Sequence, residues 1–242
     1  MSFLLGFYFK LSPSLSKNIE MVQIDVCSQE TITGTANLLK DKNVRLYGLV
    51  NNAGVGIQTS SDPVAIIDTN FYGPKRVTDS FLELVDPVKG RIVNVSSGAA
   101  SKWVREQDEG TKKLFSNSEI TWKELDEAVI YNLSKKNYTR GGYGLSKAGL
   151  SALTMIQARQ NPSLVVTSLS PGFINTPMTA GNGARLTPEQ GCVSALKCLF
   201  GDVTSGWYYG SDGLRSPLTV TRDPGTPEYQ GEDDPDASKY NI

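Results

Sequence analysis

The chain has 242 residues, of which 39% are hydrophobic and 20% charged, and its formal net charge is −1. These values predict a single large globular α/β domain and argue against nucleic acid or a membrane as a partner. The absence of histidine excludes Ser-His-Asp and Cys-His mechanisms and histidine-ligated metal, so we expect no metal site. Three cysteines without C-x-x-C spacing favour a reduced, cytoplasmic protein.

The first 18 residues form a divergent N-terminal segment. It opens with the apolar run M-S-F-L-L-G-F-Y-F-K, far short of the roughly 20 residues that cross a bilayer. No basic region precedes Phe3 and no clear small-x-small cleavage site follows it, which argues against a signal peptide. Residues 3–9 are compatible with one buried strand.

Apolar runs alternate with helical patterns along most of the chain. The runs predict buried strands at residues 21–26, 46–50, 91–95 and 164–169, with a weaker one at 207–209. The helical patterns fall at about residues 28–42, 63–86, 145–160 and 187–200. This alternation predicts a Rossmann-like, doubly wound parallel sheet that helices cover on both faces.

Two stretches interrupt the alternation. Residues 98–142 are polar, with an amphipathic piece near 122–133, and we interpret them as an insertion between a strand and the next long helix. Residues 211–242 are rich in Pro, Gly, Asp and Glu, which predicts a loop-rich tail that is frayed or disordered. The main domain therefore covers residues 19–210.

Small polar side chains follow three of the predicted strands. The stretches are L-V-N-N-A-G at 49–54, R-I-V-N-V-S-S at 91–97 and S-L-S-P-G-F-I-N-T-P-M at 168–178. An ordinary turn explains each stretch singly but explains poorly why all three occur. Since doubly wound sheets bind ligands outside the carboxyl ends of their strands, the pattern indicates a site there.

One further pair suggests chemistry. Y-G-L-S-K places Tyr143 and Lys147 one helical turn apart on the same face of a predicted helix. Taken alone, the pair is equally compatible with a half-buried tyrosine beside a solvated lysine.

Together these motifs resemble the short-chain dehydrogenase/reductase family. N-N-A-G, N-V-S-S, Y-G-L-S-K and P-G-F-I-N-T occur in the family's order, and Q-I-D-V at 23–26 and D-T-N-F-Y-G at 68–73 extend the match. The interval of 46 positions from Ser97 to Tyr143 is long for the family. It resembles the monomeric carbonyl reductases, which reduce ketones, aldehydes and quinones with NADPH. The resemblance therefore implies a monomer, a small carbonyl substrate and NADP as cofactor, with NAD not excluded.

The resemblance also implies catalytic roles. Ser97 would donate a hydrogen bond to the substrate carbonyl, while Ser96 caps local backbone. Tyr143 would donate the proton in reduction, with its pKa lowered by the Lys147 cation. Asn70 would hold a water that links Lys147 to solvent.

The same resemblance places residues along the dinucleotide. Lys147 would bond the nicotinamide ribose beside Tyr143, and the other expected contacts are Asp25 and Val26 at the adenine, Asn52, Ala53 and Gly54 at the adenosine ribose, and Ile174 and Thr176 at the carboxamide.

One family feature is missing from the sequence. No G-x-x-x-G-x-G turn, which would hold the pyrophosphate on a helix N-terminus, precedes Asp25. G-V-G at 54–56 and G-N-G at 181–183 do not continue as this fingerprint. We therefore expect an N-terminally truncated sheet with an unfilled gap and exposed edges.

Three functional hypotheses remain open at this point. The first is an NADP-dependent carbonyl reductase. The second is a truncated isoform or pseudoenzyme that binds no dinucleotide and acts as an interaction protein. The third is an epimerase or dehydratase of the same family.

Overall fold

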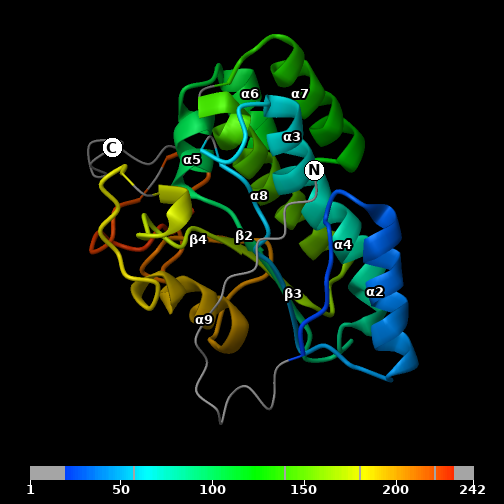
Figure 1. Ribbon diagram of the computed structural model, residues 1–242. Helices are drawn as coiled ribbons and strands as arrows, with labels where there is room; N and C mark the ends of the chain where they lie inside the picture. The colour runs from blue at the N-terminus through cyan, green and yellow to red at the C-terminus, as the bar shows by residue number, and fades with distance from the viewer. Residues whose placement is uncertain (1–19, 57, 139, 180, 221, 232–242) are drawn as a thin grey trace.

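The sheet contains four parallel strands in the order β1-β2-β3-β4 among the residues that the structure describes (Figure 1). A computed structural model describes residues 20–56, 58–138, 140–179, 181–220 and 222–231. The strands are β1 (Gly48–Asn51), β2 (Arg91–Val95), β3 (Val165–Leu169) and β4 (Tyr208–Tyr209). All four lie within two residues of the predicted runs. Their parallel register brings their carboxyl ends to one edge.

Helices cover the two faces of this sheet unequally. One face carries α2 (Gln29–Asp41), α3 (Pro63–Ile67), α4 (Gly73–Phe81) and α8 (Tyr143–Gln160), and the other carries α9 (Val193–Phe200) (Figure 1). Ile92 packs with Ala158 of α8, whereas the next residue, Val93, packs with Cys198 of α9. Successive side chains of a strand point to opposite faces, so β2 contributes to both cores. No described helix is both long and apolar enough to cross a membrane.

The chain from residue 63 to residue 84 is nearly continuous helix, as the pattern at 63–86 predicts. Asp62 caps its start by accepting a hydrogen bond from the Val64 N–H at 2.9 Å. A π-helical turn, Asp68–Tyr72, separates α3 from α4. The described residues also contain single-turn 3₁₀ helices at Leu82–Leu84, Arg140–Gly142, Pro177–Thr179 and Gln190–Cys192.

The insertion is more helical than its polar composition suggests. It contains α5 (Gly98–Arg105), α6 (Glu109–Phe115) and α7 (Trp122–Ser134), of which only α7 was expected. A capping box between Thr121 and Glu124 fixes the start of α7. Buried Trp103, Phe115 and Leu125 share one core cluster with the apolar side chains of α8. The insertion therefore packs on α8 over its length.

The strand predicted at residues 21–26 is wrong. Residues 20–25 have no regular secondary structure, and 26–27 form a turn. Val26 packs against Gly73 of α4, and its carbonyl accepts a hydrogen bond from Arg76 Nε at 3.0 Å. No described strand lies beside the segment to supply ladder hydrogen bonds, so its apolar side chains pack on helices instead. The strand expected at residues 3–9 lies outside the described residues.

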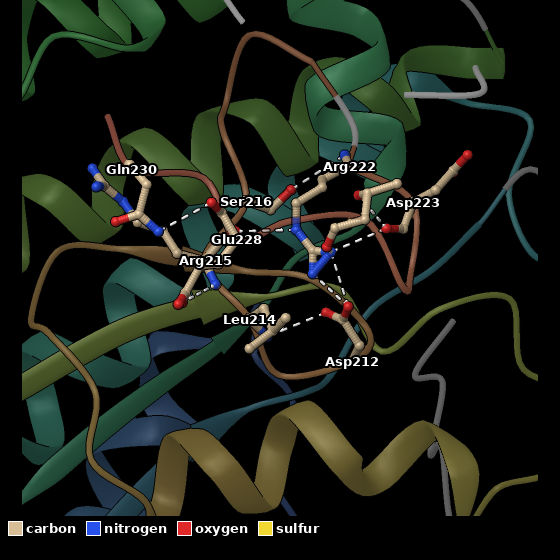
Figure 2. A network of polar contacts seen from close by, with 9 residues as sticks. Asp212, Leu214, Arg215, Ser216, Arg222, Asp223, Glu228 and Gln230 are labelled. Atoms are coloured by element: carbon tan, nitrogen blue, oxygen red, sulfur yellow. Dashed lines mark hydrogen bonds and ion pairs between the residues drawn. The ribbon is translucent and has the colours of Figure 1, made fainter. Parts of the chain in front are cut away.

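Residues 211–220 and 222–231 are not frayed, which corrects the prediction for this part of the tail. The Arg222 side chain is fully buried and forms an ion pair with Asp212. Its Nε donates to the Arg215 carbonyl oxygen at 3.3 Å, and its Nη1 donates to the Asp223 carbonyl oxygen at 3.0 Å (Figure 2). One arginine thus satisfies several loop carbonyls, which a composition rich in Pro and Gly does not reveal. Residues 232–242 lie outside the description.

Candidate active site

Asn70 connects the end of β1 to the start of α8. Its side chain is fully buried on the π-helical turn. Its Oδ1 accepts from the Val55 N–H at 2.8 Å, and its Nδ2 donates to the Val55 carbonyl at 2.9 Å and to Ser146 Oγ at 3.1 Å. The amide therefore fixes the N-N-A-G strand end against the helix that carries Tyr143 and Lys147.

Lys147 is buried between the ends of β1 and β2. Only 4% of the residue is exposed, and its Nζ donates to the Val95 carbonyl at 2.8 Å. Burial lowers the pKa of the ammonium to about 8, so the group remains largely charged at neutral pH. A Cβ on Gly54 would lie 3.5 Å from this Nζ and 3.1 Å from Asn70 Oδ1. Gly54 thus allows the strand end to approach both side chains.

Tyr143 is the first residue of α8, and two glycines determine how the chain enters that helix. Gly141 and Gly142 have φ values of 62° and 87°, a left-handed conformation that favours glycine. The tyrosine ring is half-buried, and Lys147 Nζ lies 5.8 Å from its centroid. The G-G-Y sequence therefore turns the chain so that the tyrosine lies over the lysine.

The pKa of Tyr143 is raised, not lowered as predicted. Burial of the hydroxyl is the main cause, and a hydrogen bond with Ser97 opposes it. Lys147 is itself buried, and its ammonium donates to the Val95 carbonyl. The cost of desolvating a phenolate is therefore larger than the stabilisation that the lysine cation gives it, and the pKa rises. Tyr143 is consequently a protonated phenol at neutral pH.

The two serines at the end of β2 have different partners from those expected. Ser97 caps α5, because its Oγ accepts a hydrogen bond from the Ala99 N–H at 3.2 Å. Ser96 donates to the Lys147 carbonyl at 2.9 Å and lies 2.8 Å from Ser151 Oγ. The prediction that Ser96 caps local backbone is wrong. Ser96 connects β2 to α8, and Ser97 makes the local cap.

Sequence reasoning missed Tyr208, whose side chain reaches the same region. Its hydroxyl is buried and has no hydrogen-bond partner among the described residues. It lies by the hydroxyls of Ser170 and Ser101, and the neighbouring Tyr143 helps to raise its pKa. The pattern at residues 207–209 does not indicate which of its two tyrosines faces the site. The two residues are identical in type and differ only in the face of the sheet that they occupy.

The residues expected at the adenine lie at the same edge of the sheet. The Asp25 carboxylate accepts a hydrogen bond from the Cys27 N–H at 2.9 Å, and Cys27 Sγ lies 3.4 Å from Thr69 Oγ1 on the π-helical turn. Asp25 and Val26 thus lie against the turn that carries Asn70. Of the ribose residues, Asn52 and Ala53 are exposed at the surface whereas Gly54 is buried.

The residues expected at the carboxamide follow β3. Ile174 forms an isolated bridge with Leu186, and the Thr176 N–H donates to Thr179 Oγ1 at 3.0 Å. Both Ile174 and Thr176 are half-buried. The structure therefore brings Gly54, Asn70, Ser97, Tyr143 and Lys147 into one cluster and leaves the other predicted residues around it.

Comparisons with known proteins show what the chain is similar to. A family model described as short chain dehydrogenase matches residues 10–107. The (+)-neomenthol dehydrogenase of Arabidopsis thaliana is 29% identical over 211 residues, which cover 72% of this chain and 71% of the relative. The NADPH carbonyl reductase 1 of Homo sapiens is 27% identical over 190 residues, covering 70% and 68%. The solved structure of salutaridine reductase from Papaver somniferum has a TM-score of 0.69 and 25% identity, covering 81% of this chain and 83% of that one.

The fold is the Rossmann-like sheet that the sequence predicted, and the cluster at its carboxyl edge is built on the family motifs. The chain is similar to the short-chain dehydrogenases, a class of oxidoreductases. Among these proteins, it resembles carbonyl reductases and neomenthol dehydrogenases.

Proposed function

We propose that this chain reduces ketones, aldehydes or quinones to alcohols with NADPH, and that Tyr143 is the proton donor. The observation that carries the proposal is the contact set at the sheet edge. The Tyr143 hydroxyl meets Ser97, and the buried Lys147 cation lies 5.8 Å from the tyrosine ring. The names of the relatives, an NADPH carbonyl reductase among them, support the same class of substrate.

The protonation states suit reduction. Burial raises the pKa of Tyr143, so its phenol carries the proton that the carbonyl oxygen must receive at neutral pH. The Ser97 oxygen accepts from the Ala99 N–H, and its hydrogen, which bonds Tyr143 in the substrate-free chain, would turn to the developing oxyanion when substrate binds. When the proton leaves, the charged Lys147 stabilises the phenolate. The oxygen thus gains a proton from Tyr143 while the carbonyl carbon gains a hydride, and an alcohol results.

The residues fit the two ends of the cofactor better than the pyrophosphate between them. NADPH, when bound, supplies the hydride. Tyr143, Lys147 and the loop with Ile174 and Thr176 would hold its nicotinamide side, and Asn52 to Gly54 with Asp25 and Val26 would hold the adenosine. Gly54 provides the close backbone approach that a ribose requires, since any Cβ there would meet Asn70. Residues 1–24 contain no glycine-rich turn of the kind that would hold the pyrophosphate.

A second candidate function is that of an interaction protein that binds no dinucleotide. The free edge of β1 is compatible with this candidate, since Val50 is 41% exposed and β1 pairs only with β2 among the described strands.

Titration with NADPH separates the two candidates. The reductase predicts a thermal shift and enhanced nicotinamide fluorescence at submillimolar NADPH, followed by loss of NADPH absorbance with quinones and ketones. No binding at millimolar NADPH would favour the second candidate. Parallel titration with NADH would show the cofactor preference.

Two tyrosine variants test the proton donor. Tyr143→Phe should lower kcat by about 100-fold or more while retaining NADPH binding, because the proton source is lost. Tyr131→Phe, an exposed position on α7, should leave kcat unchanged. Full turnover by the Tyr143 variant would remove Tyr143 from the mechanism.

We further propose that the chain is a monomer. Helix α7 and the loop before it bury Ile120, Leu125 and Val129 against α8. The insertion thus covers this face of α8 and leaves it unavailable to a second copy of the chain. Analytical ultracentrifugation would test this, and a dimer or tetramer would contradict it.

A further inference from the structure

A hollow of about 580 Å³ lies beside the C-terminal part of α8. Its walls come from the loop between α6 and α7, the last turns of α8, and the segments on either side of β4. Ala158 lines the hollow, and it follows Tyr143 by 15 positions on α8. At 1.5 Å per residue the two positions are about 22 Å apart along the helix. The hollow has the size of a small-molecule pocket. No residue of the Tyr143 cluster lines it, although Tyr208, a neighbour of Tyr143, lies in its wall.

Arg215 is held flat at the wall of this hollow by two aromatic rings. Its guanidinium carbon lies 3.8 Å from the centroid of Trp207 and 4.8 Å from that of Tyr229. Its backbone is fixed as well: the Arg215 N–H donates to Glu228 Oε1 at 2.8 Å (Figure 2). Cation–π stacking restrains the plane of a guanidinium and leaves the N–H groups on its edge free to bind. The side chain is therefore ordered before any ligand arrives.

The guanidinium of Arg215 lacks an acceptor within the described part of the chain, unlike those of its neighbours. Arg222 pairs with Asp212, and Arg159 donates to the Ser118 and Ile120 carbonyls. Arg215 is only half-exposed, and no described carboxylate lies within ion-pair distance of it. A partly desolvated cation with five N–H donors and no acceptor favours an anion strongly.

The rest of the wall indicates what kind of anion fits. Arg159 adds a second positive charge, and Glu119, an exposed residue, is the one carboxylate among the described lining residues. Met155, Leu218 and Trp207 supply apolar surface. From this combination we propose that the hollow binds a small organic anion. Its carboxylate or phosphate would accept two hydrogen bonds from Arg215, and its apolar or aromatic body would lie against the other wall.

Calorimetric titration of the full chain tests this site. The probes are phenyl phosphate and benzoate, with benzamide as the uncharged analogue of benzoate. We expect both anions to bind and benzamide to bind at least about tenfold more weakly. The ratio of the two anion affinities shows whether the site prefers phosphate or carboxylate.

Three variants make the test specific. Arg215→Met should weaken anion binding by about tenfold or more, and Arg215→Lys should weaken it less, because it keeps the charge but loses the planar fork. Arg45→Met is the matched control: Arg45 is exposed and donates to the Glu83 carbonyl outside the hollow, so anion affinity should not change. Far-ultraviolet circular dichroism verifies that each variant is folded.

The outcomes that would overturn the proposal are equally definite. Equal anion affinity for wild type and the folded Arg215→Lys and Arg215→Met variants would show that Arg215 is not the anchor. Equal affinity for benzamide and benzoate would show that the hollow selects no charge. A full-length variant with Glu232, Asp233 and Asp234 changed to amides tests the chain's own acidic residues. If anions bind only to that variant, the site serves those residues and not a small molecule.

Discussion

The two faces of the sheet differ in how completely helices cover them. On the α4 and α8 face, Asn94 is fully buried and donates to Thr154 Oγ1 and Gln157 Oε1, both at 2.9 Å. On the α9 face, Phe200 is 66% exposed and stacks on Tyr47, itself 44% exposed, with a centroid distance of 5.9 Å. Asn70 and Lys147, both buried, lie on the covered side. Close packing on the α4 and α8 face fixes the position of these side chains, and the partly exposed α9 face does not provide such packing.

The largest expected difference between the faces is in packing energy. Trp103→Ala should lower the free energy of unfolding by about 3–5 kcal/mol, because it leaves a cavity where the insertion packs on α8. Phe200→Ala should change it by less than about 1 kcal/mol, since most of that ring already contacts water. Urea denaturation measures both. A cost above about 2 kcal/mol for the Phe200 variant is typical of a buried residue and would mean that the α9 face is covered in solution.

The covered face also buries a charge, which makes stability depend on pH. The pKa of Lys147 falls from 10.5 to about 8 in the folded chain. Between these values the unfolded chain binds more protons, so the free energy of unfolding rises with pH, by about 3 kcal/mol over the window. Below pH 8 the cost of burying the ammonium is fully present.

A lysine variant isolates this contribution. Urea denaturation of wild type and Lys147→Met at several pH values gives the difference between the two proteins, which should rise from pH 8 to pH 10.5. Burial raises the pKa of Cys198 from 9.0 to about 11, which opposes the rise in both proteins and cancels in the difference. Parallel curves would contradict a buried ammonium.

The smallest expected effect compares neighbouring tyrosines on opposite faces. The Tyr209 hydroxyl, on the α9 side, accepts from the Thr204 N–H at 2.7 Å, so Tyr209→Phe should cost about 1 kcal/mol. Tyr208→Phe removes a buried hydroxyl that bonds to no described group, and stability should stay within about 0.5 kcal/mol or increase. Thermal denaturation measures both. A larger loss for the Tyr208 variant would show that its hydroxyl has a partner in solution.

Sequence reasoning found the parts of the fold that depend on local pattern. The apolar runs at 91–95 and 164–169 predict β2 and β3, and the motif order places Asn70, Ser97, Tyr143 and Lys147 at one sheet edge. Local pattern was sufficient because parallel strands present their carboxyl ends together whatever the loops do.

Other features depend on partners far away in the chain. Residues 21–26 have the pattern of a strand, but no described strand lies beside them. The strand that this pattern predicts therefore does not form. The direction of the Tyr143 pKa shift depends on how deeply its hydroxyl is buried, which spacing does not reveal. Arg215 lies eight residues from Trp207 and fourteen from Tyr229, and only the tertiary fold stacks the three side chains.

The π-helical turn at Asp68–Tyr72 has a consequence for how this family of sequences tolerates length changes. The Gly73 N–H bonds to the Asp68 carbonyl, five residues back, so the turn contains one residue more than an α-helical turn. An α-helix rotates by about 100° per residue, so this extra residue sets the angular phase between α3 and α4. Deleting any one residue of D-T-N-F-Y would preserve the helix yet turn its second half by about 100°. The turn at Asp68–Tyr72 therefore does not tolerate the deletion of a residue, although helices flank it on both sides.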